Sequence, residues 1–202
     1  MDLLSKKAVE IIGFLSAFPE IKACSLYGSL ADGTSDQYSD IDIKADVSGI
    51  DNDAFMKALP ELLSRRFPVI WHDFAVSLVP EQYIVSIEVD EKNPFCIVDL
   101  NCVAVPHVQN VQKSDLENDA CYHLIKLWVV NCKHFFRKTD CSRDIRKMGK
   151  RTIGSACEKM SDRQILDEVL CRLENNAAPE TAEYIINCRK VWMKDCCTLK
   201  VG

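Results

Sequence analysis

The chain has 202 residues, of which 48% are hydrophobic and 27% charged, enough apolar material for one large or two small packed domains. Its formal charge is -5, so the whole chain lacks the basic excess typical of proteins that hold a phosphate polymer. A small substrate is therefore favoured, and a nucleic-acid polymer is not expected as a partner. No apolar run approaches the roughly 20 residues that span a bilayer, so no membrane partner is expected either.

The chain has eleven cysteines, whose pattern is informative about the cellular compartment and about metal binding. The first residues form an amphipathic pattern without the apolar core and cleavage site of a secretion signal. We therefore expect a cytoplasmic protein with reduced thiols. The cysteines form no Cys-x-x-Cys pair, and the histidines fall at no zinc-ligand spacing with them. We interpret the cysteines as small core residues.

The first half of the chain predicts both helices and strands. Apolar residues at helical spacing predict a helix over residues 2–18, and residues 21–27 predict a strand. A loop rich in turn-forming residues follows over residues 28–39. Residues 40–47 alternate polar and apolar side chains, which predicts a strand with one polar face. Residues 51–66 predict a helix that covers the sheet.

The pattern then changes from strands to helices. Two apolar segments, about 82–89 and 95–104, flank a turn and predict a hairpin. Helical periodicity follows, with Ser114 as the expected N-cap. Breaks near residues 139–142, Ser161 and Pro179 predict about four helices. The expected fold class is α+β: a mixed sheet with flanking helices over residues 1–110, followed by a C-terminal helical bundle over residues 111–202.

The loop after the first strand contains groups that suit phosphate binding. Gly28 allows close backbone approach, while the Ser29 hydroxyl and nearby N–H groups can donate to phosphate oxygens. Asp40 and Asp42 follow, two positions apart on one strand face and about 6–7 Å from each other. A divalent cation relieves the repulsion of such a pair, and carboxylate oxygens suit Mg²⁺. The loop and the acidic pair therefore predict a metal-bound nucleotide.

Asp99 is the third candidate metal ligand. It is the only charged residue in the apolar segment Phe95–Val103, and burying an unpaired carboxylate is costly. Two-metal phosphoryl or nucleotidyl transfer commonly uses a further carboxylate to hold the second ion about 3.5–4 Å from the first. We therefore predict that Asp40, Asp42 and Asp99 hold two Mg²⁺ ions.

The order and spacing of these residues resemble the nucleotidyltransferase superfamily that includes DNA polymerase beta. Its small members share a glycine–serine pair, a second glycine, a Ser-Asp-x-Asp strand and a later aspartate. This chain reads Gly28-Ser29-x3-Gly33-x5-Ser39-Asp40-x-Asp42, then Val98-Asp99-Leu100. The resemblance implies that Asp40 and Asp42 bind both metals and that Asp99 binds the catalytic one. It also places Gly28, Ser29 and Ser39 near a nucleoside triphosphate, for which ATP is the expected nucleotide.

The short length and the helical second half look like the antibiotic nucleotidyltransferases within that superfamily, which modify aminoglycosides or lincosamides. In those enzymes a carboxylate at the start of the helical half often acts as base, and a helix lysine contacts the nucleotide. Here Asp115, Glu117 or Asp119 would supply the base and Lys126 the cation. The implied activity is transfer of a nucleoside monophosphate to a hydroxyl of a small acceptor, which would confer antibiotic resistance.

Several alternatives stay open. Similar minimal nucleotidyltransferases act on a protein or tRNA in toxin–antitoxin pairs, and a nucleotide-binding module without transfer also suits the motif. A P-loop is disfavoured because Thr34 stands where that motif needs lysine. Residues 133–151 are basic, and Arg143, Arg146 or Lys147, and Lys150 lie at helical spacing. That stripe would face a triphosphate, an RNA partner or water. The sequence is compatible with a homo-oligomer.

Overall fold

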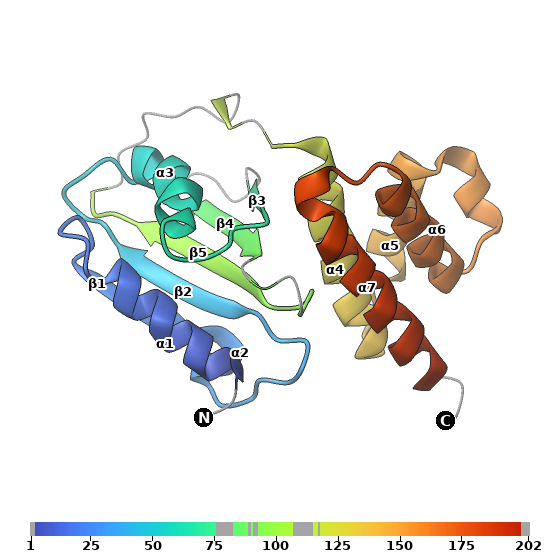
Figure 1. Ribbon diagram of the computed structural model, residues 1–202, viewed down its shortest axis with the longest axis horizontal. Coiled ribbons are helices and arrows are strands. Elements are labelled where there is room, and N and C mark those ends of the chain that lie inside the picture. The colour runs from blue at the N-terminus through green and yellow to red at the C-terminus, as the bar shows by residue number, and fades with distance from the viewer. Residues whose placement is uncertain are drawn as a thin grey trace. The chain divides into compact units, whose positions relative to one another are not determined.

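The computed structural model describes residues 3–75, 83–88, 90, 93–106, 115–116 and 118–198. These residues belong to two compact units, one within Met1–Asp90 and Phe95–Asn118 and the other within Glu91–Pro94 and Asp119–Gly202. The first unit is mixed α and β, and the described part of the second is helical (Figure 1). The predicted α+β class is confirmed. The division falls after Asn118, eight residues beyond the expected boundary.

The first unit contains a five-stranded mixed sheet in the order β1-β2-β5-β4-β3. Its strands are β1 Ala23–Tyr27, β2 Ile41–Asp46, β3 Trp71–Phe74, β4 Tyr83–Glu88 and β5 Ile97–Val103. β2 and β5 pair in parallel, and the other pairs are antiparallel. The two strands predicted to carry acidic residues are therefore direct neighbours in the middle of the sheet.

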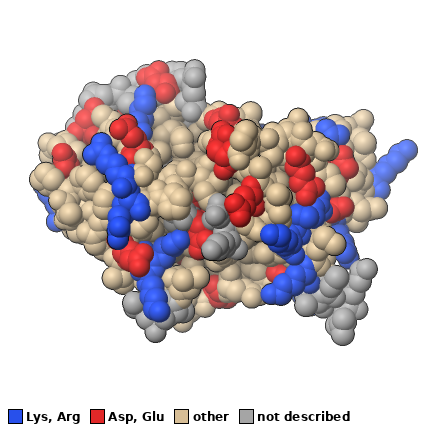
Figure 2. Space-filling view, viewed as in Figure 1, with Lys and Arg blue, Asp and Glu red and all other residues tan. Residues whose placement is uncertain are grey.

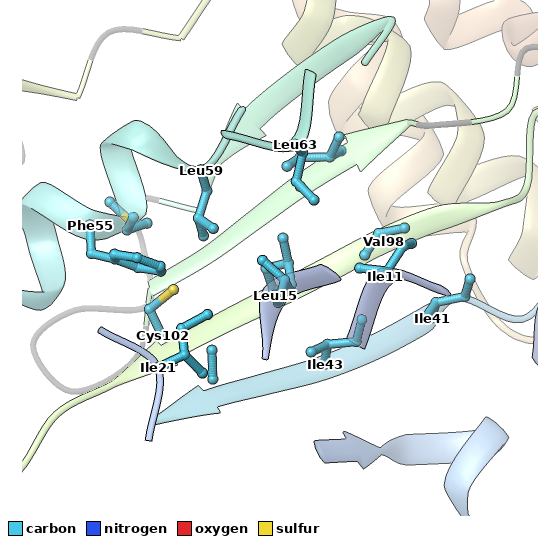
Figure 3. Packing of buried hydrophobic residues seen from close by; sticks show 14 of the residues in the cluster. Ile11, Leu15, Ile21, Ile41, Ile43, Phe55, Leu59, Leu63, Val98 and Cys102 are labelled. Atoms are coloured by element: carbon cyan, nitrogen blue, oxygen red, sulfur yellow. The ribbon is translucent and has the colours of Figure 1, made fainter. Parts of the chain in front are cut away.

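Helices α1 (Leu3–Leu15) and α3 (Asn52–Ser64) pack on one face of this sheet (Figure 1). Figure 3 shows their apolar side chains meeting those of β2 and β5 in the core. Ile41 and Ile43 of β2 and Val98 of β5 are fully buried there, and each such side chain contributes about 1.5–3 kcal/mol. Since side chains alternate along a strand, the residues between them point to the opposite face.

Most predicted elements of the first unit are present. The hairpin is confirmed, with Glu88 of β4 opposite Ile97 of β5. The helix predicted over residues 51–66 is α3, which begins after the N-cap Asp51, whose carboxylate accepts hydrogen bonds from the backbone N–H groups of Asp53 and Ala54 at 3.0 Å. Two short elements were not predicted. They are β3 and the four-residue helix α2 (Gly28–Ala31).

The second unit contains four α-helices, as predicted, and one 3-10 helix among its described residues. They are α4 Ala120–Phe136, α5 Ser142–Thr152, η2 Gly154–Lys159, α6 Asp162–Asn175 and α7 Pro179–Thr198. The predicted N-cap Ser114 lies outside the described residues. The described helix α4 begins at Ala120, and its N-cap is Asp119. No helix in the described part of the chain is both long and apolar enough to cross a membrane.

Candidate active site

Asp42 and Asp99 are register partners in the parallel strands β2 and β5. Both side chains are partly buried, and both lie on the sheet face opposite α1 and α3, because the residues flanking each of them fill the helix-covered core. Neighbouring strands are about 4.8 Å apart. Two carboxylates at that spacing repel each other unless a cation lies between or beside them. The structure therefore brings together two acids from segments more than fifty residues apart.

The turn after β1 lies directly against one of these acids. Tyr27, the last residue of β1, is the register partner of Asp42. Gly28 follows with a φ of 67°, a left-handed conformation that favours glycine. A Cβ on Gly28 would collide with the Asp42 carboxylate, whose Cγ would be 3.0 Å away. Only a residue without a side chain brings the backbone this close to the acid.

The residues after Gly28 form a compact turn. The backbone N–H of Asp32 donates to the Gly28 carbonyl at 3.0 Å, and that of Thr34 donates to the Ser29 carbonyl at 2.9 Å. Ser29 is partly buried in α2. The predicted phosphate loop is therefore an ordered turn beside Asp42. A phosphate contact by Ser29 remains a prediction.

Tyr27 is a residue of this site that sequence reasoning missed. Burial, together with the charges of Asp42 and then Asp99, raises the pKa of its phenol to about 12. The phenol therefore stays protonated at neutral pH and can act as a hydrogen-bond donor beside the two carboxylates. Its position at the strand end, immediately before the glycine, was the available sequence signal, but tyrosine is common at strand ends.

Ser39 and Asp40 precede β2. Ser39 is buried, and its hydroxyl donates to the Asp36 carboxylate at 3.1 Å while accepting from the Asp36 backbone N–H at 2.9 Å. Ser39 therefore shapes the loop that leads into the acidic strand, and a direct contact with the triphosphate remains a prediction. Asp40 is partly buried and lies immediately before the first residue of β2.

The carboxylates suit a magnesium site that a ligand would complete. In the part of the chain that the structure describes, no three His, Cys, Asp or Glu side chains gather as a ready-made metal cage. Mg²⁺ commonly takes only one or two protein carboxylates and fills its other positions with water and phosphate oxygens. Asp42 and Asp99 as direct neighbours, with the Gly28 turn against them, fit that mode of binding. Asp40 would join as a third ligand.

The remaining predicted residues belong to other elements. Lys126 is partly buried in α4 of the second unit. Of the three base candidates, Asp115 is exposed and Glu117 lies outside the described residues. The Asp119 carboxylate accepts hydrogen bonds from the backbone N–H groups of Cys121 and Tyr122 at 2.8 and 2.9 Å. Capping thus explains Asp119 structurally. The catalytic roles of Lys126 and the base candidates remain predictions.

Charge is unequally divided between the two parts of the chain. Residues 1–118 hold 9 Lys and Arg against 19 Asp and Glu, a net charge of -10, while residues 119–202 hold 16 against 11, a net charge of +5. On the face drawn in Figure 2, acidic and basic side chains lie intermixed. The difference is therefore one of net charge, and that face is not divided into patches of one sign.

Comparisons with known proteins add little to this geometry. No family model matches the chain, and no curated protein matches it. One similar solved structure is that of a GLD-2/RNP-8 complex, with 14% sequence identity, a TM-score of 0.37, and coverage of 87% of this chain and 56% of that chain. The chain thus spans just over half the length of the chain it matches. Structural overlap this low supports no conclusion about function.

Proposed function

We propose that the chain is a metal-dependent nucleotidyltransferase. The observation that carries this proposal is the register of Tyr27, Asp42 and Asp99 across three adjacent strands, with the Gly28 turn against the Asp42 carboxylate. Phosphate chemistry needs a place where metal-bound phosphate oxygens meet both carboxylates and backbone donors. The superfamily resemblance of the Gly-Ser and Asp-x-Asp motifs supports the same assignment.

Each residue of the site would have a distinct task. Asp40, Asp42 and Asp99 would hold Mg²⁺, which when bound favours ionisation of an acceptor hydroxyl and neutralises departing pyrophosphate. The Gly28 turn would hold the outer phosphates. The acceptor oxygen forms a bond to the α-phosphorus, the bond from that phosphorus to the pyrophosphate oxygen breaks, and the hydroxyl proton passes to a base. Tyr27, protonated and beside the carboxylates, would donate a hydrogen bond to a bound oxygen.

The acceptor is proposed in two classes, with ATP as the expected nucleotide. A small hydroxylated antibiotic, an aminoglycoside or a lincosamide, follows from the resemblance. The net charge of -10 over residues 1–118 supports a cationic aminoglycoside. The alternative acceptor, a tRNA or protein, is supported for tRNA by the net positive charge of residues 119–202.

The test follows the two ends of the triphosphate separately. The full chain is incubated with Mg²⁺, ATP labelled on either the α- or the γ-phosphate, and kanamycin, lincomycin or bulk tRNA. We expect the α-label to move to one acceptor with release of pyrophosphate. Transfer of the γ-label would identify a kinase and contradict the proposal. Nucleotide binding without transfer to any acceptor would favour the binding-module alternative.

A further inference from the structure

Helix α5 presents a row of cations that the proposed chemistry does not use. Its five basic side chains are all exposed: Arg143, Arg146, Lys147, Lys150 and Arg151. Arg146 contacts the Asp162 carboxylate at 3.5 Å. Within the described residues, the other four cations make no ion pair. One acid, Asp144, lies on the same helix. A helix surface with four unpaired cations attracts anions over about the 8–10 Å of a Debye length, and charges farther away than that are largely screened.

A hollow of about 190 Å³ lies beside this row, between α4 and α5. Leu127, Val130 and Met148 supply its apolar lining, and Lys147 and Arg151 bring two of the unpaired cations to it. His134 also lines the hollow. Its exposed ring contacts the Thr139 hydroxyl through Nδ1 at 3.0 Å. Asn131 and Asp144 complete the lining. The hollow therefore combines an apolar surface, an aromatic ring and two cations with one carboxylate, within a single unit of the protein.

Single-stranded nucleic acid has the chemistry that matches this combination. Such ligands bind where a basic groove follows the phosphates and a ring or apolar surface stacks on a base. Residues four apart on a helix are separated by about 6 Å along its axis, so Arg143, Lys147 and Arg151 form a regular row of charge suited to successive phosphates. We propose that the α5 cations and the α4–α5 hollow bind single-stranded RNA, with phosphates on Lys147 and Arg151 and one base beside His134.

A lipid surface matches these features less well. Membrane-surface helices insert an exposed apolar face, whereas Ile145 and Met148 of α5 are buried. Gly149 also faces the inside of the unit, since a Cβ there would lie 2.6 Å from the Ile165 side chain of α6. With its apolar residues packed inside, α5 offers a membrane only charge.

The inference rests on the proposed function and deepens it, because it favours RNA over a small antibiotic as the acceptor. RNA binding itself is measured in an assay that requires no nucleotidyl transfer. The expectation of a small acceptor rests on the net charge of the whole chain and on the resemblance to the antibiotic nucleotidyltransferases. The helical part alone is net positive, and its unpaired cations are clustered on one helix.

The experiment measures binding of a fluorescent 15-nucleotide single-stranded RNA of mixed sequence to the full chain by anisotropy at several salt concentrations. One phosphate contact from each of the four unpaired α5 cations predicts a slope of log K against log salt of about -3. The double variant Lys147→Glu/Arg151→Glu should weaken binding roughly tenfold or more and reduce the slope by about 1.4. The matched control is Lys190→Glu/Lys194→Glu, which makes the same charge change at the same spacing on exposed residues of α7. It should bind RNA within about twofold of wild type.

A second pair of variants tests the base separately from the phosphates. His134→Ala should weaken binding roughly fivefold or more with an unchanged salt slope, because stacking involves no counterion release. His134→Tyr should restore binding.

Equal losses of RNA affinity in both double variants would overturn the proposal. Binding of the wild-type chain to phosphatidylserine vesicles but not to RNA would overturn it as well. Wild-type RNA affinity in His134→Ala would contradict the proposed binding of a base beside His134.

The two proposals fail in different ways. RNA binding without nucleotidyl transfer would retain this inference and contradict the proposed function. Transfer to an antibiotic without RNA binding would do the reverse.

Discussion

Gly28 lies so close to the Asp42 carboxylate that no side chain fits between them. Gly28→Ala must therefore displace either the turn or the acid, in addition to straining a residue whose φ is 67°. We expect a loss of nucleotidyl transfer of 100-fold or more, since an error of about 1 Å in a reacting group costs that much. Initial rates with the labelled-ATP assay would measure the loss.

Gly33 provides the control for that substitution. Its φ is 69°, so alanine there meets the same backbone strain of about 1 kcal/mol, but no atom lies within 4 Å of the added Cβ. Gly33→Ala should therefore lose stability without a comparable loss of rate. Equal rate losses in the two variants would show that strain in the loop, and not contact with Asp42, determines activity.

Magnesium should stabilise the folded protein through Asp42 and Asp99. At ten times its Kd, a ligand that binds only the folded state adds about 1.4 kcal/mol, which corresponds to a rise in Tm of about 3–6 °C for a chain of this size. Asp42→Asn or Asp99→Asn should abolish most of this rise. Thermal unfolding with and without Mg²⁺ would measure it.

Asp46 is the matched control for the magnesium experiment. It lies on the same strand as Asp42 and on the same face, four residues later, and hydrogen bonds from Ser48 lower the pKa of its carboxyl. Asp46→Asn should keep the rise in Tm caused by Mg²⁺. Loss of the rise in Asp46→Asn as well would indicate weak attraction of cations to the acidic unit and not binding at a site.

The phenol of Tyr27 should titrate late. Its pKa is raised from 10.0 to about 12, so the unfolded chain releases this proton first. The resulting contribution to stability is complete below pH 10 and is lost as the pH rises through about 12. Asp42→Asn should lower the pKa without returning it to 10, because burial is the larger cause. A spectrophotometric phenol titration of wild type and Asp42→Asn, each compared with Tyr27→Phe to identify the Tyr27 signal, would detect the shift. An unchanged Tyr27 pKa in Asp42→Asn would contradict the proximity of Tyr27 and Asp42.

A buried hydrogen bond joins α4 to α6 in the helical unit. The indole Nε1–H of Trp128 donates to the Leu166 carbonyl at 2.8 Å. Trp128→Phe should reduce the free energy of unfolding by about 1–3 kcal/mol, because it removes a buried donor as well as part of the packed ring.

Trp192→Phe is the comparison for Trp128. The Trp192 indole donates to the Asp167 carboxylate at 2.9 Å. Because the Asp167 side chain is 51% exposed, water can replace the lost donor. Chemical denaturation should show the smaller loss for Trp192→Phe. The reverse order would contradict the role given to burial.

Local patterns predicted the elements that carry the site. The polar and apolar alternation of residues 40–47 predicted β2 and the side of it that holds Asp42. The single charge in an apolar segment predicted the strand of Asp99. Periodicity and breaks also predicted the four helices after Asn118. Each of these signals is contained within one element, which is why it was readable from the sequence.

Features that depend on pairing between distant segments were not readable. The parallel pairing of β2 with β5, which places Asp42 opposite Asp99, involves residues more than fifty positions apart. The four-residue strand β3 contains His72 and Asp73, so its apolar signal is weak. Ser114 and Asp119 are both good N-caps, and periodicity extending to Leu116 favoured the earlier one. Tyr27 gained its significance only from the two acids beside it.

The central claim is that Asp42 and Asp99 support nucleotidyl transfer, and magnesium-dependent release of pyrophosphate tests it most directly. Wild type, Asp42→Asn, Asp99→Asn and the control Asp46→Asn would be compared with ATP, GTP, CTP and UTP in the presence of aminoglycosides, lincosamides or RNA. We predict release by wild type and Asp46→Asn with at least one acceptor, and a loss of most activity in the other two variants. Near-normal release by Asp42→Asn would contradict the account.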